Sequence, residues 1–132
     1  MKKPRKILVI DDSAVMLARI KRALVAEGYE VIATTQLVGN ARHLPTCDLV
    51  LIDYHMPGLN GSSVLDSLRS VATTMKSKQP FYVYTSDSMI ALKSRELGFD
   101  GAFSNKGDDE ELVRQVRAYF RILDMREARE AT

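Results

Sequence analysis

Short apolar runs of strand-forming residues alternate along this chain with stretches whose apolar residues recur at helical spacing. This alternation is typical of βαβ units, in which helices join parallel strands and cover both faces of the sheet. The runs ILVI and LVLI are apolar throughout, which predicts two central strands buried on both faces. We therefore predict an α/β fold with a single, doubly wound, five-stranded parallel sheet. The predicted strands span 6–10, 29–33, 49–52, 81–84 and 101–104.

A helix is predicted after each strand. The first has Asp12 or Ser13 as its N-cap and ends at Gly28, a residue type common just past helix ends. The last begins near Asp108 and Asp109, whose charges suit the positive end of the helix dipole. The pattern of the second helix is weak and short. The five predicted helices span about 13–28, 36–44, 62–71, 88–97 and 108–123.

The composition limits the number of domains and the class of partner. A chain of 132 residues with 45% hydrophobic content matches one compact domain, which we place at 1–124, with a charged helical extension or connector at 125–132. Its 19 basic and 17 acidic residues give a net charge of +2, which demands neither nucleic acid nor an anionic membrane as partner. Cys47 is the single cysteine and no long apolar span occurs, so we expect a cytoplasmic protein without an internal disulfide.

Polar residues follow three of the predicted strands at the point where each strand ends. Asp11 and Asp12 follow the first strand, Asp53 follows the third and Thr85 follows the fourth. In a parallel sheet these positions converge at one edge, where ligands bind. Carboxylates about 4 Å apart repel by about 4 kcal/mol per pair at an effective dielectric constant near 20, so a cation is needed to neutralise them. Oxygen ligands favour Mg²⁺ or Mn²⁺ over zinc, and Mg²⁺ readily accepts a phosphoryl oxygen, so the sequence predicts a metal site directed at phosphate.

The motifs VIDDS, LVLIDYHMPGLNG and VYTSD, followed by a basic residue after the fifth strand, occur in this order along the chain. Together they resemble the receiver domains of two-component response regulators, the CheY-like superfamily, over about residues 6–123. The resemblance implies a flavodoxin-like (βα)5 receiver fold and a Mg²⁺-dependent phosphorylation that switches affinity for a protein partner. A protein of this kind is not a separate enzyme, although it catalyses its own phosphorylation and dephosphorylation.

The resemblance implies a role for each residue of the cluster. Asp53 matches the phosphoacceptor, which attacks a phosphohistidine of a partner protein and becomes an aspartyl phosphate. Asp11 and Asp12 match the metal-binding acids, and Asp53 and the backbone carbonyl of His55 complete the protein's share of the Mg²⁺ ligands. Thr85 matches the hydroxyl that hydrogen-bonds the new phosphate.

The chain departs from the family pattern after its fifth strand, where relatives carry a lysine that pairs with the phosphoryl group. Counting along GFDGAFSNKG from Gly98 puts Ala102 at the position of a switch aromatic and Asn105 at that of the lysine. Counting back from Lys106 puts Phe103 at the switch position instead. Strand alternation favours the first register, because it buries Phe103. A bulge or a flexible loop can still bring Lys106 to the phosphate, so both readings stay open.

The resemblance also implies the partners. A histidine kinase or phosphotransfer protein supplies the phosphoryl group, and a downstream protein binds the surface of the predicted elements 88–97, 101–104 and 108–123. We expect no direct binding to nucleic acid or to a membrane. The alternative is a phosphorylation-independent interaction module with the same fold, which the irregular fifth strand favours and the intact acids disfavour. A phosphatase with an aspartyl nucleophile is disfavoured, because Ser13 stands where a second aspartate is required.

Overall fold

A five-stranded parallel sheet forms the centre of the molecule. The computed structural model describes residues 3–36 and 41–131. The strands lie in the order β2-β1-β3-β6-β7, and every neighbouring pair is parallel. The predicted α/β class with one doubly wound sheet is therefore confirmed. The strands are β1 (Lys6–Ile10), β2 (Glu30–Thr34), β3 (Leu49–Asp53), β6 (Phe81–Tyr84) and β7 (Gly101–Phe103).

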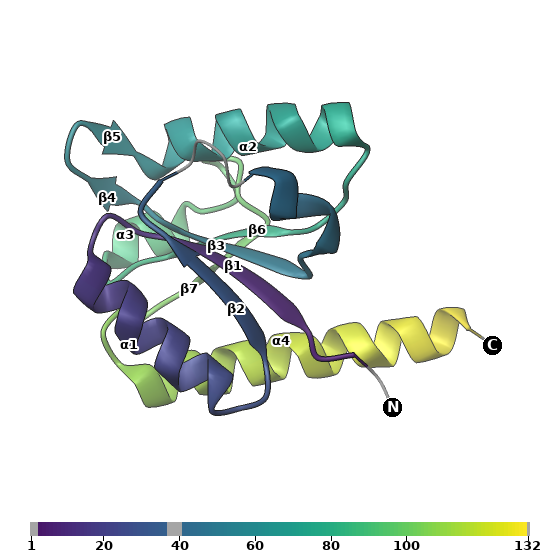
Figure 1. The fold of residues 1–132 in the computed structure, drawn as a ribbon. Coiled ribbons are helices and arrows are strands. Elements are labelled where there is room, and N and C mark those ends of the chain that lie inside the picture. Colours follow the sequence, from purple (N-terminus) through teal and green to yellow (C-terminus); the bar gives the residue numbers. More distant parts are fainter. Residues whose placement is uncertain (1–2, 37–40, 132) are drawn as a thin grey trace.

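Helices cover both faces of this sheet (Figure 1). One layer consists of α1 (Ala14–Val25) and α4 (Asp109–Glu130), whose buried side chains pack with one set of strand residues. The other layer contains α2 (Gly61–Met75), a 3₁₀ turn η1 (Ala41–Thr46) and the short helix α3 (Ser88–Leu92). Among the residues that the structure describes, no helix is both long and apolar enough to cross a bilayer.

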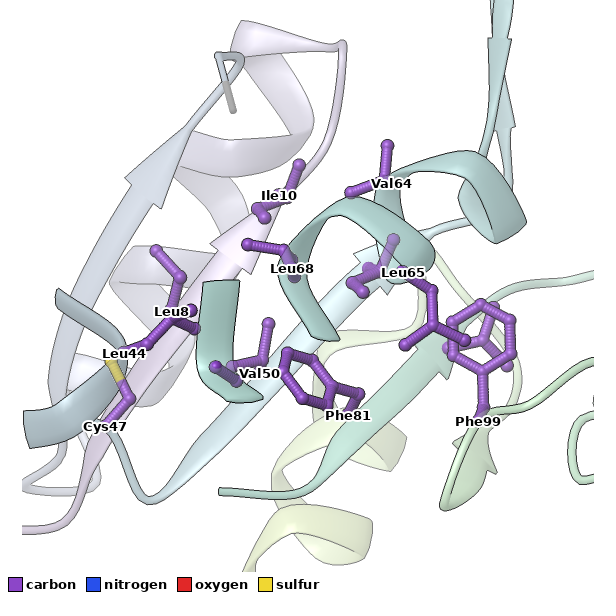
Figure 2. Packing of buried hydrophobic residues seen from close by; sticks show 13 residues of the cluster. Leu8, Ile10, Leu44, Cys47, Val50, Val64, Leu65, Leu68, Phe81 and Phe99 are labelled. Atoms are coloured by element: carbon purple, nitrogen blue, oxygen red, sulfur yellow. The ribbon is translucent and has the colours of Figure 1, made fainter. Parts of the chain in front are cut away.

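The core explains why the central strands carry apolar residues at every position. Alternate residues of β1 and β3 point to opposite faces, so each strand contributes to both hydrophobic layers. Figure 2 shows Leu8, Ile10 and Val50 of the sheet against Val64, Leu65 and Leu68 of α2. All six are nearly fully buried, with at most 3% of the residue exposed.

Two of the predicted N-caps are present, at the first turns of α1 and α4. The hydroxyl of Ser13 accepts a hydrogen bond from the Met16 amide, and the carboxylate of Asp108 accepts one from the Glu111 amide. These caps fix where α1 and α4 begin, directly after the loops that end β1 and β7.

Two predicted helices need correction. Of the helix expected over 36–44, residues 37–40 lie outside the described residues, and 41–46 form a 3₁₀ turn that contains Pro45. The helix expected over 88–97 ends at Leu92, and the chain continues in turns up to Gly98. Ser94 and Phe99 are buried in this segment, and the Phe99 amide donates to the Ser94 carbonyl, so tertiary packing replaces the helical ladder. The last helix continues to Glu130, which agrees with the helical alternative predicted for the extension over 125–132.

A small hairpin projects beyond the end of β3 (Figure 1). Its strands β4 (His55–Met56) and β5 (Leu59–Asn60) pair antiparallel around the turn formed by Pro57 and Gly58. The sequence MPGLNG predicts a bend here but no strands. The hairpin leads straight into α2, whose N-cap is Asn60.

Candidate functional site

Three carboxylates converge at the carboxyl ends of β1 and β3. Asp11 and Asp12 follow β1, and Asp53 is the last residue of β3. Each offers an oxygen, and these oxygens all lie within 4.8 Å of one another. Asp11 and Asp53 are buried, with 2% and 6% of the residue exposed, whereas Asp12 is exposed. The carboxyl ends of these two central strands therefore carry two desolvated acids and one acid that is open to solvent.

The loop that enters α1 holds Asp11 in place. Its Oδ1 accepts a hydrogen bond from the Ser13 amide at 2.9 Å, and its own amide donates to the Thr34 carbonyl at 3.3 Å. The Asp-x-Ser spacing of the sequence produces this turn, because the carboxylate reaches an amide two residues on. The second oxygen of Asp11 is thereby directed toward Asp53 and Lys106.

Lys106 reaches the acids, and Asn105 does not. The ammonium Nζ of Lys106 lies 2.5 Å from Oδ2 of Asp11 and 2.8 Å from Oδ1 of Asp53. Only 15% of the Lys106 side chain is exposed. Asn105 is exposed to solvent instead. A protein cation therefore bridges two carboxylates of the cluster.

The turn after β7 reconciles the two registers of the sequence. Phe103 is buried between the sheet and α4, with its ring centroid 4.9 Å from that of Tyr82, as strand alternation predicts. The chain then takes left-handed conformations at Asn105 (φ 59°) and Gly107 (φ 105°). These two residues flank Lys106 and redirect the backbone. Phe103 can therefore stay in the core while Lys106 enters the site.

Burial dominates the electrostatics of Asp53. Desolvation raises the pKa of its carboxyl above the ordinary value, and the charges of Asp11 and Asp12 act in the same direction. The hydrogen bond and the charge of Lys106 lower this pKa and so oppose the rise. The lysine thus only partly offsets the cost of a charged carboxylate here.

Thr85 lies beside the acids at the end of β6. It is buried, and its amide donates to the Phe103 carbonyl at 3.1 Å. Its hydroxyl oxygen Oγ1 accepts a hydrogen bond from the Asp87 amide at 3.0 Å. The hydroxyl therefore organises the loop that leads into α3.

Two side chains without a predicted role, those of His55 and Asp87, meet beside the cluster. Nε2 of His55 lies 3.0 Å from Oδ2 of Asp87. The hydrogen bond from His55, followed by that from the Ile90 amide, holds the pKa of Asp87 below its ordinary value. The spacing of Asp87 before α3 signals an N-cap, but a contact across 32 positions of the chain leaves no local pattern in the sequence.

The donor set of the cluster fits a hard divalent cation. All three side chains are carboxylates, and Mg²⁺ prefers oxygen ligands and is commonly held by one or two carboxylates together with water and phosphate. The exposed Asp12 leaves one side of the cluster open to solvent. The arrangement can therefore hold Mg²⁺ and admit a phosphoryl group next to Asp53.

Comparison with known families and curated proteins gives concordant results. The family model of the response regulator receiver domain matches residues 7–117. The chain is 32% identical over 125 residues to the DNA-binding response regulator MtrA of Mycolicibacterium paratuberculosis, and 32% identical over 122 residues to the transcriptional regulatory protein CpxR of Escherichia coli. These matches cover 91% and 88% of this chain but 53% and 49% of the relatives. The chain thus spans about half the length of the curated relatives it matches.

Solved structures with the same fold cover nearly the whole chain. The receiver domain of the response regulator TorR is 26% identical, has a TM-score of 0.70 and is matched over 89% of this chain and 97% of that one. The chemotaxis response regulator CheY4 of Vibrio cholerae is 20% identical, with a TM-score of 0.70 and coverage of 87% and 98%. A CheY-like receiver domain protein from Methanospirillum hungatei has 18% identity, a TM-score of 0.72 and coverage of 93% and 98%. The last two likenesses show the fold alone.

Proposed function

The chain belongs to the family of response regulator receiver domains, and from this premise we propose that it is a phosphorylation switch with Asp53 as its acceptor. The observation that carries the proposal is the convergence of Asp11, Asp12 and Asp53 at one sheet edge, with the Lys106 ammonium 2.8 Å from the acceptor. The side chains of Asp11, Asp53 and Lys106 form a charged cluster with little exposure to solvent. It matches the chemistry of phosphoryl transfer, which depends on positioning and charge neutralisation.

The transfer step uses the free oxygen of the acceptor. Lys106 engages Oδ1 of Asp53, so we assign the attack on phosphorus to Oδ2. As the new P–O bond forms, the P–N bond of the donor phosphohistidine breaks and its electron pair stays on the departing imidazole. Lys106 holds the carboxylate in orientation and neutralises part of the charge on the phosphoryl oxygens. Hydrolysis of the aspartyl phosphate by water resets the switch.

Three carboxylates and one carbonyl are assigned to the metal. Asp11, Asp12, Asp53 and the backbone carbonyl of His55 would hold Mg²⁺. When bound, Mg²⁺ neutralises charge that develops on the transferred phosphoryl group. Asp12, which is exposed, is the residue through which we expect the ion to enter.

Thr85 connects the site to the surface that faces partners. The hydroxyl of Thr85 now accepts a hydrogen bond from the Asp87 amide. If the hydroxyl rotated toward the phosphate, this hydrogen bond would break. Asp87 is the N-cap of α3, so this change would alter the start of that helix. Met89 and Leu92 on α3, which are 55% and 79% exposed, and the adjoining surfaces of β7 and α4 form the partner surface in this proposal.

The partners we propose are proteins. A histidine kinase or phosphotransfer protein donates the phosphoryl group, and a downstream protein reads the surface of α3, β7 and α4. Because the chain spans about half of its curated relatives, the DNA binding in their names is not assigned to this chain. A cytoplasmic location follows from the same proposal, since the donor kinases act on cytoplasmic receivers.

One observation favours a second function, a phosphorylation-independent interaction module. Lys106 already neutralises part of the charge of Asp11 and Asp53, so the cluster has a resident cation without any metal. In such a module the acids and the lysine would be a structural ion network. The two functions differ in whether Asp53 becomes esterified.

Intact mass spectrometry distinguishes the two functions. The protein is incubated with acetyl phosphate and Mg²⁺, and a gain of one phosphoryl group is expected. Asp53→Asn should abolish the gain, whereas Asp66→Asn, which removes an exposed carboxylate of α2, should leave it unchanged. No gain with acetyl phosphate or with a phosphorylated histidine donor would favour the interaction module.

A further inference from the structure

A groove of about 410 Å³ lies at the amino end of β6, at the opposite end of this strand from Thr85. β7 pairs with β6 from Tyr82 onward, so the segment before Tyr82 borders the groove. Side chains of α2 and α4 also line it, although these helices cover opposite faces of the sheet. A volume of this size is typical of pockets that bind small molecules.

The lining of this groove includes a buried amide that lacks a hydrogen-bond acceptor. Gln79 lines the groove, and only 9% of the residue is exposed. Its Oε1 accepts a hydrogen bond from the Ser77 hydroxyl, whereas its Nε2 has no partner among the described residues. An unpaired buried donor is costly, and folded proteins satisfy the great majority of such groups. Gln79 therefore requires an acceptor that the described part of the chain does not supply.

The charges around the groove favour a ligand with a single negative charge. Arg69 donates from Nη2 to the Gly98 carbonyl at 2.6 Å and to Oδ2 of Asp100 at 3.3 Å, so its charge is already engaged. Lys78 lines the groove, is exposed and forms no ion pair with a described residue. One cation is thus left for a ligand, and the nearby carboxylate of Asp100 opposes a second negative charge.

The remaining lining combines apolar surface with a neutral donor. Pro80 and Leu123 line the groove with carbon atoms and are half-buried. Burial raises the pKa of Tyr119 to about 12, so its hydroxyl stays protonated at neutral pH. Ligand pockets commonly join an apolar lining to a few polar groups that fix the orientation of the ligand. This lining therefore fits an apolar body that carries one anionic group.

We propose that this groove binds a small monocarboxylate with an apolar body. The carboxylate accepts a hydrogen bond from Nε2 of Gln79, after this side chain rotates toward the groove, and pairs with the Lys78 ammonium. The apolar body packs on Pro80 and Leu123. The site is separate from the proposed phosphorylation, because the groove lies at the amino end of β6 and the acid cluster lies at the carboxyl ends of the strands.

Benzoate is the probe, and the side-chain amide of Gln79 is the readout. Nitrogen-labelled protein is titrated with benzoate and followed by proton–nitrogen correlation spectra. The signal of this amide, identified by its loss in Gln79→Met, should shift and saturate. Benzamide has the same shape without the charge and should bind at least about fivefold more weakly. Benzylammonium carries the opposite charge and should leave the signal unshifted.

Variants test the two polar contacts one at a time. Gln79→Met removes the amide at similar size and should weaken benzoate binding about two- to tenfold, as measured on the backbone amides of 77–81. Lys78→Gln should weaken it about two- to fivefold. Because Lys78 is exposed, this variant tests the site even if Gln79→Met does not fold. Lys21→Gln removes an exposed cation of α1 and should leave the affinity unchanged.

Three results would overturn the carboxylate site. These are the absence of a saturable shift at Gln79, equal affinities for benzoate and benzamide, and unchanged benzoate affinity in Lys78→Gln. Each is read from the groove itself and does not depend on whether Asp53 becomes phosphorylated. Failure of the phosphorylation assay would therefore leave this proposal standing, and failure here would leave the proposed function standing.

Discussion

At the scale of single residues, burial of Asp53 couples the site to the stability of the fold. Its raised pKa means that the folded protein binds this proton more tightly than the unfolded chain does. Ionisation of Asp53 therefore lowers the free energy of unfolding as pH rises from the ordinary aspartate pKa through the raised folded value. We expect Asp53→Asn to raise Tm at pH 7 by a few degrees, and the difference to vanish below about pH 3.5.

Thermal unfolding of metal-free protein across this pH range tests the expectation. Asp66→Asn, which removes an exposed carboxylate, should show no such trend. If Asp53→Asn proved less stable than the wild type at neutral pH, the bond to Lys106 would outweigh the desolvation of Asp53.

Gly61 is a second residue whose identity is fixed by the backbone around the acceptor. A Cβ at Gly61 would lie 2.8 Å from Cα of Tyr54 and 2.9 Å from the carbonyl oxygen of Asp53. Neither is the end of a flexible side chain, so the backbone itself must shift. Gly61→Ala should lower the free energy of unfolding by about 1–3 kcal/mol and slow phosphorylation of Asp53. Urea denaturation measures the first effect, with Ser70→Ala on the exposed part of α2 as a control that should lose no stability.

The sequence predicts which residues come together better than it predicts the contacts between them. Asp11, Asp12, Asp53 and Thr85 could be found because each follows a strand, and strand ends of a parallel sheet converge. The choice between Asn105 and Lys106 could not be made, since it depends on left-handed conformations at Asn105 and Gly107.

At the scale of elements, the turn between β7 and α4 delivers a cation to the acids. Mg²⁺ bound to Asp11 and Asp53 would share these carboxylates with Lys106, and a unit charge about 4 Å from a dication costs about 2 kcal/mol even at the dielectric constant of water. Lys106→Gln should therefore tighten Mg²⁺ binding by about tenfold or more while it slows phosphorylation.

The shift of Tm with Mg²⁺ concentration measures this affinity, since an ion that binds the folded state stabilises it by mass action. Lys78→Gln removes an exposed cation that precedes β6, away from the acids, and should leave the affinity near the wild-type value. Weaker Mg²⁺ binding in Lys106→Gln would show that the lysine organises the carboxylates more than it competes with the ion.

Strands and helices differ in how far local sequence determines them. All five strands were predicted to within one residue at each end, and the apolar runs of β1 and β3 match their burial on both faces. The predicted end of α3 was wrong. Ser94 and Phe99 are buried, and their packing favours turns in a segment for which helix propensity predicts a helix. The hairpin β4–β5 was missed for a similar reason: strands of two residues carry no periodic pattern.

At the scale of the whole molecule, Arg5 ties the beginning of the chain to its last helix. Its guanidinium pairs with Asp124 and Glu127 of α4 and with Asp48, and lies 5.7 Å from the centre of the Phe120 ring. The hydrogen bond to Glu127 is the main reason that the pKa of Arg5 is raised. This Arg5 clamp explains how the charged segment after Leu123 continues the helix.

Arg5→Ala should therefore loosen the end of α4 without unfolding the domain. We expect faster amide exchange over residues 124–130 and a loss of about 1 kcal/mol in the free energy of unfolding. Hydrogen exchange followed by mass spectrometry measures the first effect, with Arg126→Ala, an exposed cation of the same segment, as the control. Unchanged exchange over 124–130 would show that helix propensity alone sustains this segment.

The Arg5 clamp also has a practical consequence. It joins the segment before β1 to α4 at the amino ends of the strands, whereas Asp53 is the last residue of β3, at the carboxyl ends. Any cargo fused to either terminus would thus be carried on the far side from the acceptor. If the protein were tethered to a solid support through one terminus, the carboxyl ends of the strands, which carry Asp53, would face the bulk solution.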